Sequence, residues 1–382
     1  MPWMERCRMT QRMELLVALD SGLFSMSELC ERFGVSRKTG YKWLKRRAEK
    51  GVEGTRDLSR RPGSSPRRTA PGIEELFVEM RKVHDDWGPR KLLRVVGRGH
   101  AELVLPARST VAAILKRRGL IETRRRRRRP VHPGRPFGHV TGANQLWTAD
   151  FKGQFRTRDG VYCYPLTIAD QHSRFLLACD SLTSTQNVGV RPVFDRLFRT
   201  CGLPDAIRTD NGVPFASTAI HGLSTLSVWW IQLGIRHERI EPGRPEQNGC
   251  HERMHRTLKR RTTLPPAMNA GAQQRLFDDF RQEYNQVRPH EALGDEPPAT
   301  VWRPSPRPCP DRIAGPEYPG HFIPRLVSNA GHFRLKSRQI FISNALKQEV
   351  LGLEEIDDGV WSIYYYDVLL ARLDERNWKI VP

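Results

Sequence analysis

Apolar positions in the first 50 residues recur at helical spacing and predict three short helices. Met13, Leu16 and Leu19 mark the inner face of the first helix. Ser25 and Glu28 have the spacing of a capping box, which predicts the start of a second helix that ends near residue 33. Gly34 then makes a turn and Ser36 caps a third helix. This pattern predicts a helix-turn-helix domain over residues 1–50.

A second group of helices is predicted over residues 70–121. An amphipathic helix begins with the apolar positions Ile73, Leu76, Phe77 and Met80. The segment closes with a helix from about residue 110 that turns Val111, Ile114 and Leu115 inward and stops near Gly119. We expect a second helix-turn-helix or a winged-helix domain.

The pattern changes to a two-residue period at residue 146, within a region that extends from 140 to 305. Leu146, Thr148 and Asp150 alternate with the apolar Trp147, Ala149 and Phe151. Further strand-like runs cover residues 161–168 and 175–182, and a helix over residues 190–198 precedes a strand that ends at Asp210. This order predicts an α/β domain with a mixed sheet and flanking helices.

The last part of the chain, residues 320–382, reads as short β-strands. Six prolines between residues 304 and 319 interrupt regular structure and mark a boundary. The runs HFRL, QIFI, VWSIYYY and VLLARL follow, with a turn at Asp357, Asp358 and Gly359. We expect a small antiparallel β-barrel.

Charge divides the chain unevenly. The formal net charge is +21, and residues 1–140 alone hold 33 Lys and Arg against 15 Asp and Glu. Two basic segments, 51–69 and 122–139, are rich in Arg, Pro, Gly or Ser and read as linkers. Such an excess of positive charge indicates a polyanionic partner, and its position beside helix-turn-helix patterns indicates double-stranded DNA.

Most of the predicted DNA contacts are Arg or Lys side chains in a helix or linker, and Tyr41, Asn248 and His255 are added to them. In a recognition helix the first side chains meet base edges while cations hold phosphates. The alternative for each is an ordinary solvated surface cation. The predicted set is Arg37, Lys38, Tyr41, Lys42, Lys45, Arg60, Arg61, Arg124, Arg125, Arg126, Arg127, Arg128, Arg129, Asn248, His255, Arg256, Lys259 and Arg260.

Three acids on separate elements form a candidate metal site. Alone, Asp210 reads as a turn aspartate and Glu252 as a solvated helix residue, whereas Asp150 in an alternating strand is costly without a partner. Asp170 lies in a predicted hairpin turn, which explains it better than metal binding does. Together Asp150, Asp210 and Glu252 indicate oxygen ligands for divalent cations and two-metal phosphodiester chemistry.

These segments together resemble the catalytic core of DDE transposases and retroviral integrases. The motifs are LWTADFKG, IADQHSRF, AIRTDNGVPF, GRPEQNGCHER and YNQVRPHEALGDEPPATVW, in this order, within residues 140–305. The resemblance is greatest to integrase-core transposases of bacterial insertion sequences. It implies a ribonuclease H-like fold in which Asp150, Asp210 and Glu252 hold two Mg²⁺ ions, with Mn²⁺ as a substitute.

The resemblance also implies an activity. Such a protein binds the terminal inverted repeats of a transposon, cuts to expose a 3′-hydroxyl, joins it to target DNA, and works as a homo-oligomer assembled on DNA. Two alternatives stay open, a non-catalytic DNA-binding regulator derived from a transposase and a hydrolytic ribonuclease H-like nuclease.

One spacing departs from the family pattern. About 35 residues often separate the second and third acids, whereas 41 lie between Asp210 and Glu252, and Glu246 would give 35. Glu252 is the prediction because Pro245, Asn248, Gly249 and Glu252 fit the family pattern Pro-x-x-(Asn/Gln)-Gly-x-x-Glu.

Cysteine usage and hydropathy indicate where the protein acts. Seven cysteines occur without a C-x-x-C pair, which argues against a zinc module and for reduced thiols. No segment approaches the roughly 18 apolar residues of a membrane span, and no signal-peptide pattern begins the chain. We expect a cytoplasmic protein that associates with the nucleoid when it binds DNA and has no membrane partner.

Overall fold

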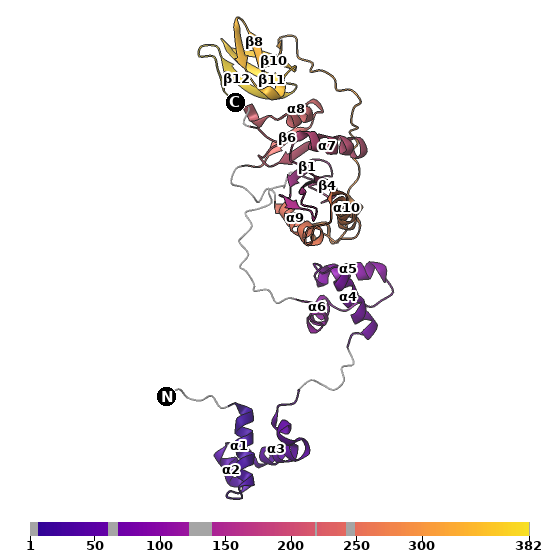
Figure 1. Ribbon diagram of the computed structural model, residues 1–382, viewed down its shortest axis with the longest axis vertical. Helices are drawn as coiled ribbons and strands as arrows, with labels where there is room; N and C mark the ends of the chain where they lie inside the picture. The colour runs from indigo at the N-terminus through magenta and orange to yellow at the C-terminus, as the bar shows by residue number, and fades with distance from the viewer. Residues whose placement is uncertain (1–6, 60–67, 122–139, 218–219, 242–248, 382) are drawn as a thin grey trace. The chain divides into compact units, whose positions relative to one another are not determined.

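The computed structural model describes residues 7–59, 68–121, 140–217, 220–241 and 249–381 (Figure 1). The chain divides into two compact units, Met1–Thr69 and Ala70–Pro382, and each is described by itself. Within the described ranges no helix has the length and apolar character that a membrane span requires.

The first unit contains the three predicted helices. They are α1 (Arg8–Asp20), α2 (Met26–Arg32) and α3 (Arg37–Lys50), and a 3₁₀ turn, η1 (Gly51–Thr55), follows. The capping box is confirmed, because Ser25 accepts from the Glu28 amide while Glu28 accepts from the Ser25 amide. Helices α2 and α3 cross closely at Gly40, where a Cβ would lie 2.6 Å from the Met26 sulfur. A larger residue at position 40 would therefore require the Met26 and Cys30 side chains to move.

The second unit begins with another group of three helices. They are α4 (Pro71–Val83), α5 (Pro89–Gly99) and α6 (Arg108–Arg117). Phe77, Trp87 and Leu92 form their common core with Val96 and Val111. The prediction that Val111, Ile114 and Leu115 face inward is confirmed, since each is at most 1% exposed.

A mixed six-stranded sheet forms the centre of the second unit. Its strands are β1 (Leu146–Phe151), β2 (Phe155–Arg156), β3 (Tyr162–Asp170), β4 (Leu176–Leu182), β5 (Ala206–Thr209) and β6 (Arg236–Arg239). The order is β2-β3-β1-β5-β6, and β4 pairs with β3. Strand β1 is antiparallel to β3 but parallel to β5, which is parallel to β6. The predicted mixed sheet is confirmed.

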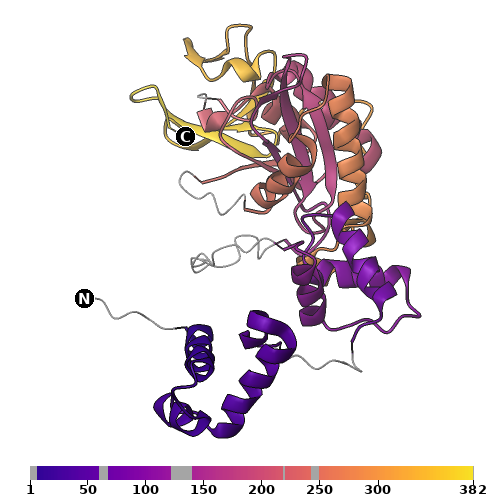
Figure 2. The same ribbon diagram turned by 60° about the horizontal axis from the view of Figure 1, so that its bottom comes forward.

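Helices cover both faces of this sheet. They are α7 (Asn187–Cys201), α8 (Thr225–Gln232), α9 (Gly249–Thr262), α10 (Ala270–Gln286) and the short α11 (Pro298–Val301), and 3₁₀ turns are η2 (Ile220–Gly222) and η4 (Glu291–Leu293). One face packs Trp147 against Phe194 of α7 and Trp230 of α8. The other packs Leu176 against Leu258 of α9 and Phe277 of α10. In Figure 2 the orange helices lie against the magenta strands.

The C-terminal region is a separate antiparallel sheet with a hairpin. Its elements are β7 (Ile323–Leu326), β8 (His332–Leu335), β9 (Arg338–Phe341), η5 (Asn344–Leu346), β10 (Val350–Asp357), β11 (Val360–Tyr365), β12 (Val368–Asp374) and β13 (Lys379–Val381). The strand order is β13-β12-β11-β10-β7, and β8 pairs with β9. No pairing between β13 and β7 joins the two ends of this sheet among the described strands. The β content is as predicted, but a closed barrel is not confirmed.

Helix α8 is apolar on two sides because it packs in two cores. Leu226 and Trp230 join the core of the central sheet. Val228 and Ile231 join the core of the C-terminal sheet, beside Leu353. Its sequence TLSVWWIQ therefore has no polar face. We call the contact of α8 with the C-terminal sheet the apolar junction.

We call the six-stranded sheet and its flanking helices the central domain. Charged residues connect residues 84–98 to α9 and to residues 288–296 of this domain. Arg288 lies 2.8 Å from Asp86, and each side chain is only 11% exposed. Arg90 contacts Asp295 and Glu291, both at 2.7 Å. Further ion pairs join Arg94 and Arg98 to Glu296, Arg260 to Asp85, and Arg261 to Asp86. We call this set the ionic junction.

Candidate active site

Asp150 and Asp210 lie at the carboxyl ends of neighbouring parallel strands. Asp150 is the fifth of the six residues of β1, and Asp210 directly follows β5. The register pairs Ala149 with Thr209, so the next residue on each strand is an aspartate. Adjacent strands are about 4.8 Å apart, and this edge therefore brings two carboxylates close together.

Alternation along β1 decides which way its side chains point. Trp147 and Ala149 are buried in the core shared with α7 and α8. Thr148 and Asp150 face the opposite side, toward α9. The Asp150 side chain is 16% exposed, and one of its oxygens lies 3.9 Å from Nδ1 of His255. The Asp210 carboxylate accepts from the Gly212 amide at 3.1 Å.

Glu252 lies in the first turn of α9 and is exposed. The opposite face of α9 buries Met254 and Leu258, which are four residues apart. Among the described residues no group of three or more His, Cys, Asp or Glu side chains could hold a metal ion. The structure thus brings Asp150 and Asp210 together but does not complete the cluster with Glu252. Glu246 and Asn248 lie outside the described residues.

Two histidines on the buried face of α9 contact threonines of the sheet. His251 places Nδ1 2.9 Å from the Thr148 hydroxyl and Nε2 2.8 Å from the Thr167 hydroxyl. His255 places Nε2 2.7 Å from the same Thr167 oxygen. Burial lowers the pKa of His251 to about 4 and that of His255 to about 2, so both rings are neutral at pH 7.

The DNA contact predicted for His255 needs correction. Its ring is 5% exposed and lies between α9 and the sheet, out of reach of a phosphate. The sequence places His255 one turn after His251, on the stripe that also carries Met254 and Leu258. That spacing was the available signal that both histidines are buried rather than exposed.

A similar contact lies beneath Asp210. The Thr209 hydroxyl is 2.9 Å from Nε2 of His237 on β6, and it donates to the Asp210 carbonyl at 2.9 Å. Burial, with Arg239 nearby, lowers the pKa of His237 to about 4. No local sequence pattern identifies the contact between Thr209 and His237, because the two residues become neighbours only when β5 pairs with β6.

Asp170 has a structural role, as its turn position predicted. It is 1% exposed, and its two oxygens accept from the amides of Asn144 and Ser173, both at 2.7 Å. The Ser173 hydroxyl donates to it at 2.6 Å. These bonds close the β3–β4 turn, and they occupy the carboxylate.

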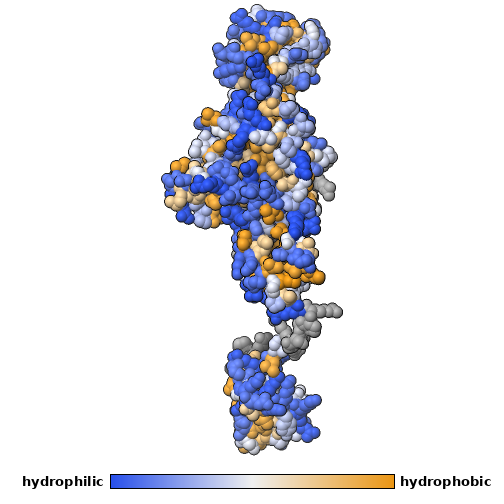
Figure 3. Space-filling view, turned by 90° about the vertical axis from the view of Figure 1, so that its right-hand side faces the viewer, coloured by the Kyte–Doolittle hydropathy of each residue, from blue (hydrophilic) through white to orange (hydrophobic). Residues whose placement is uncertain are grey.

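The remaining predicted DNA contacts differ in their surroundings. Five of them, Arg37, Lys38, Tyr41, Lys42 and Lys45, are exposed along α3, and Arg256 and Lys259 are exposed on α9. Arg260 is also exposed but pairs with Asp85 at 2.6 Å. The predicted residues that lie outside the described ranges are Arg60, Arg61, Arg124, Arg125, Arg126, Arg127, Arg128, Arg129 and Asn248. Hydrophilic residues cover much of the face in Figure 3.

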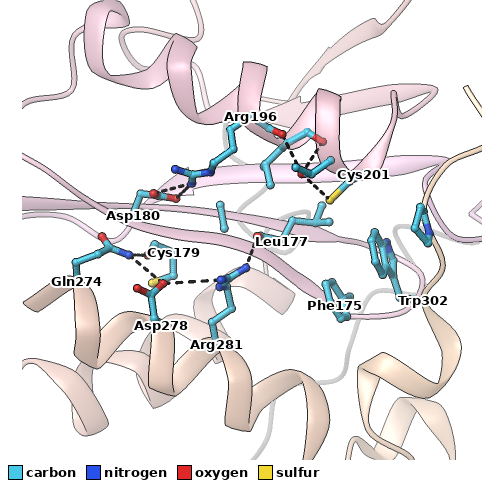
Figure 4. A pocket seen from close by; sticks show the side chains of 14 residues that line it. Phe175, Leu177, Cys179, Asp180, Arg196, Cys201, Gln274, Asp278, Arg281 and Trp302 are labelled. Atoms are coloured by element: carbon cyan, nitrogen blue, oxygen red, sulfur yellow. Dashed lines mark hydrogen bonds and ion pairs between the residues drawn. The ribbon is translucent and has the colours of Figure 1, made fainter. Parts of the chain in front are cut away.

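A cavity of about 670 Å³ lies beside β4, between α7 and α10, and none of the three candidate acids lines it (Figure 4). Side chains of α10 occupy the open edge of β4. Gln274 donates to the Cys179 carbonyl at 3.0 Å, and Arg281 donates to the Leu177 carbonyl at 3.2 Å. These bonds protect an edge strand from pairing with another chain.

Models of known protein families match the N-terminal helices and the central sheet separately. Two models described as an integrase core domain match residues 140–245 and 233–298. Models of a helix-turn-helix domain and a homeodomain-like domain match residues 11–63 and 39–115. The matches place DNA-binding helices before an integrase core.

Two similar proteins come from insertion elements. The uncharacterized 39.2 kDa protein of insertion element IS476 from Xanthomonas euvesicatoria is 30% identical over 181 residues, which cover 47% of this chain and 50% of that protein. The uncharacterized 31.7 kDa protein of IS407 from Burkholderia multivorans is 28% identical over 222 residues, 57% of this chain and 76% of that protein. This chain thus spans half of the length of the first relative.

Retroviral integrases are also similar. The HTLV-2 integrase catalytic core domain, solved in complex with magnesium, is 15% identical and covers 42% of this chain and 97% of its own, with a TM-score of 0.34. This chain thus combines matches to helix-turn-helix domains with matches to an integrase core domain. It is similar to proteins of bacterial insertion elements.

Proposed function

We propose that this protein is a DNA transposase that binds the terminal inverted repeats of its element, cuts at each 3′ end, and joins that end to target DNA. The observation that carries the proposal is the position of Asp150 and Asp210 on neighbouring parallel strands. Two carboxylates at one sheet edge, within a region that matches an integrase core, suit phosphodiester chemistry.

Asp150 and Asp210, with Glu252 from α9, are the residues that would hold divalent cations. Their oxygen donors fit Mg²⁺, for which Mn²⁺ can substitute, and we propose two ions. When bound, such ions would activate the attacking oxygen and stabilise charge at the phosphate. Because Glu252 does not complete a cluster with the aspartates among the described residues, we expect α9 to adjust when DNA and metal bind.

The proposed reaction consists of two displacements at phosphorus. In cleavage, a water oxygen bonds to phosphorus, the bond to the 3′-oxygen breaks, and that oxygen takes up a proton. In joining, the new 3′-hydroxyl loses its proton, its oxygen bonds to a target phosphorus, and the target's 3′-oxygen leaves. No covalent bond between protein and DNA is required.

Exposed cations supply the proposed DNA contacts. Arg37 and Lys38 lie in the first turn of α3, the position from which a recognition helix meets base edges. Lys42 and Lys45, and on α9 Arg256 and Lys259, would hold phosphates. Since both ends of an element must be joined, we propose a homo-oligomer assembled on DNA.

The test is a reaction of purified protein, Mg²⁺, a labelled duplex with the DNA that flanks this reading frame, and a plasmid target. We expect joined products that disappear with chelator, with Asp150→Asn and with Glu252→Gln. Cleavage without joining would instead establish a nuclease. Salt-sensitive binding without either reaction, in Mg²⁺ and in Mn²⁺, would establish a DNA-binding regulator. Joining by Glu252→Gln but not by Glu246→Gln would transfer the third acid to Glu246.

A further inference from the structure

Each of the two aspartates has a buried threonine bonded to its main chain. The Thr167 hydroxyl donates to the Asp150 carbonyl at 3.0 Å, and the Thr209 hydroxyl donates to the Asp210 carbonyl at 2.9 Å. Both threonines are at most 1% exposed. The two lie on different strands, β3 and β5, so the repetition does not arise from one local sequence motif.

Each threonine also contacts histidine through Nε2. The Thr167 hydroxyl oxygen lies 2.8 Å from Nε2 of His251 and 2.7 Å from Nε2 of His255. The Thr209 hydroxyl oxygen lies 2.9 Å from Nε2 of His237. A hydroxyl has one proton and two lone pairs. Because that proton goes to the aspartate carbonyl, each imidazole must donate from Nε2. The arrangement therefore specifies the same tautomer for all three rings.

This tautomer settles the neighbouring contacts as well. Nδ1 of His251 has no proton and accepts a hydrogen bond from the Thr148 hydroxyl at 2.9 Å. The Thr148 hydroxyl also lies 3.3 Å from the Ala169 carbonyl, but its one proton is directed to His251. Nδ1 of His255 likewise carries a lone pair and no proton. Its 3.9 Å approach to the Asp150 carboxylate is therefore not an ion pair.

Packing alone does not require these polar groups. A valine would fill the space of either threonine, and buried hydroxyl and imidazole groups are costly unless they are fully hydrogen-bonded. The hydrogen bonds add a defined orientation of α9 relative to the sheet. His251 and His255 are one turn apart and converge on a single oxygen, which fixes the rotation of α9 about its axis, with Glu252 between them.

We infer that Thr167 and Thr209, with their histidine partners, are positioning residues that orient Asp150, Asp210 and the helix of Glu252 for metal binding. The inference rests on the proposed function. None of these threonines or histidines touches substrate in this role. They act through the main chain of the aspartates and through the rotation of α9.

The test compares isosteric variants of the full chain. Thr167→Val and Thr209→Val remove only the hydroxyls, while Thr167→Ser and Thr209→Ser keep them. Thr262→Val is the matched control, because Thr262 is a buried threonine of α9 whose hydroxyl donates to the Leu258 carbonyl of its own helix. Mn²⁺ binding is measured by electron paramagnetic resonance, and DNA joining, DNA affinity and thermal unfolding are measured alongside.

We expect both valine variants to lose about 10-fold to 100-fold in Mn²⁺ affinity and joining rate, as for other groups that orient metal ligands. The serine variants and Thr262→Val should resemble the wild type, and DNA affinity should not change. If a valine variant does not fold, the pair His237→Gln and His237→Leu replaces it, since glutamine keeps a side-chain N–H donor and leucine does not.

Folded valine and leucine variants with wild-type Mn²⁺ affinity and joining rate would overturn the inference and leave a packing role. The proposed function has a separate criterion. If the wild-type protein does not join DNA, the proposed function fails whatever the threonine variants do. If Asp150→Asn loses both and the valine variants lose neither, only the positioning inference fails.

Discussion

The two junctions of the central domain differ in their chemistry. At the apolar junction, Val228 and Ile231 of α8 are buried with side chains of the C-terminal sheet such as Leu353. At the ionic junction, carboxylates pair with guanidinium groups to connect residues 84–98 to the central domain. One junction is stabilised by removing hydrocarbon from water, the other by pairing charges.

This difference predicts opposite responses to salt. The Debye length falls from about 10 Å at 0.1 M to about 3 Å at 1 M, which weakens exposed ion pairs. Apolar burial is not screened in this way. We therefore expect salt to loosen the ionic junction and to leave the apolar junction intact. A polyanion such as DNA would compete for the same arginines.

The largest expected effect comes from truncating the apolar junction. Ile231 is 7% exposed, and Ile231→Ala should cost roughly 2–5 kcal/mol because a cavity remains. Hydrogen exchange of β10 and β11 by mass spectrometry measures the loss. Ile356→Ala on β10 is the control, since Ile356 is 46% exposed and should change exchange little. Equal effects of the two variants would contradict the assignment of this core.

Breaking the most buried ion pair should have the next largest effect. Asp86→Ala leaves Arg288 without its partner in a position that is 11% exposed, which should cost about 3 kcal/mol. Hydrogen exchange of α4 and α5 reports the change. In a double-mutant cycle, Asp86→Ala with Arg288→Ala should lose less than the sum of the single variants. Additive losses would show that the pair is not coupled.

An exposed pair of the same junction provides the reference for that experiment. Arg94 is 49% exposed and its partner Glu296 is 36% exposed, so Arg94→Ala should cost at most about 1 kcal/mol. In this variant Glu296 still has an ion pair with Arg98, which lies 2.8 Å from it.

A further expected effect is a dependence of stability on pH. Burial, with Arg288 nearby, lowers the pKa of Lys91 to about 8. The unfolded chain keeps this proton until about pH 10.4, so above pH 8 the unfolded state binds more protons and stability rises with pH. Below pH 8 both states are protonated and the dependence disappears. Lys91→Met should flatten the rise in unfolding midpoint between about pH 8 and pH 10; an unchanged slope would exclude Lys91 as its source.

Local patterns predicted much of the fold. The capping box at Ser25 and Glu28 and the inward face of α6 depend on residues a few positions apart. The turn role of Asp170 was predicted for the same reason, since Ser173 is three residues away. The alternation in β1 correctly separated Asp150 from Trp147 and Ala149.

Contacts between distant residues were not predictable in this way. Thr167 and His255 are 88 positions apart, and Arg90 and Asp295 are 205 apart. His255 was assigned to DNA because its neighbours on α9 are cations, although its own position lies on the buried stripe. The barrel was inferred from short β-like runs in the sequence and from the family resemblance, whereas closure depends on pairing between the first and last strands.

The two-sided helix α8 has a practical consequence for dividing the protein into fragments. A fragment that ends after the central domain would expose Val228, Ile231 and Leu223 on one surface. Such an apolar patch favours self-association and precipitation. Replacing these three positions with polar residues, or keeping the C-terminal sheet, is therefore advisable when the central domain is expressed.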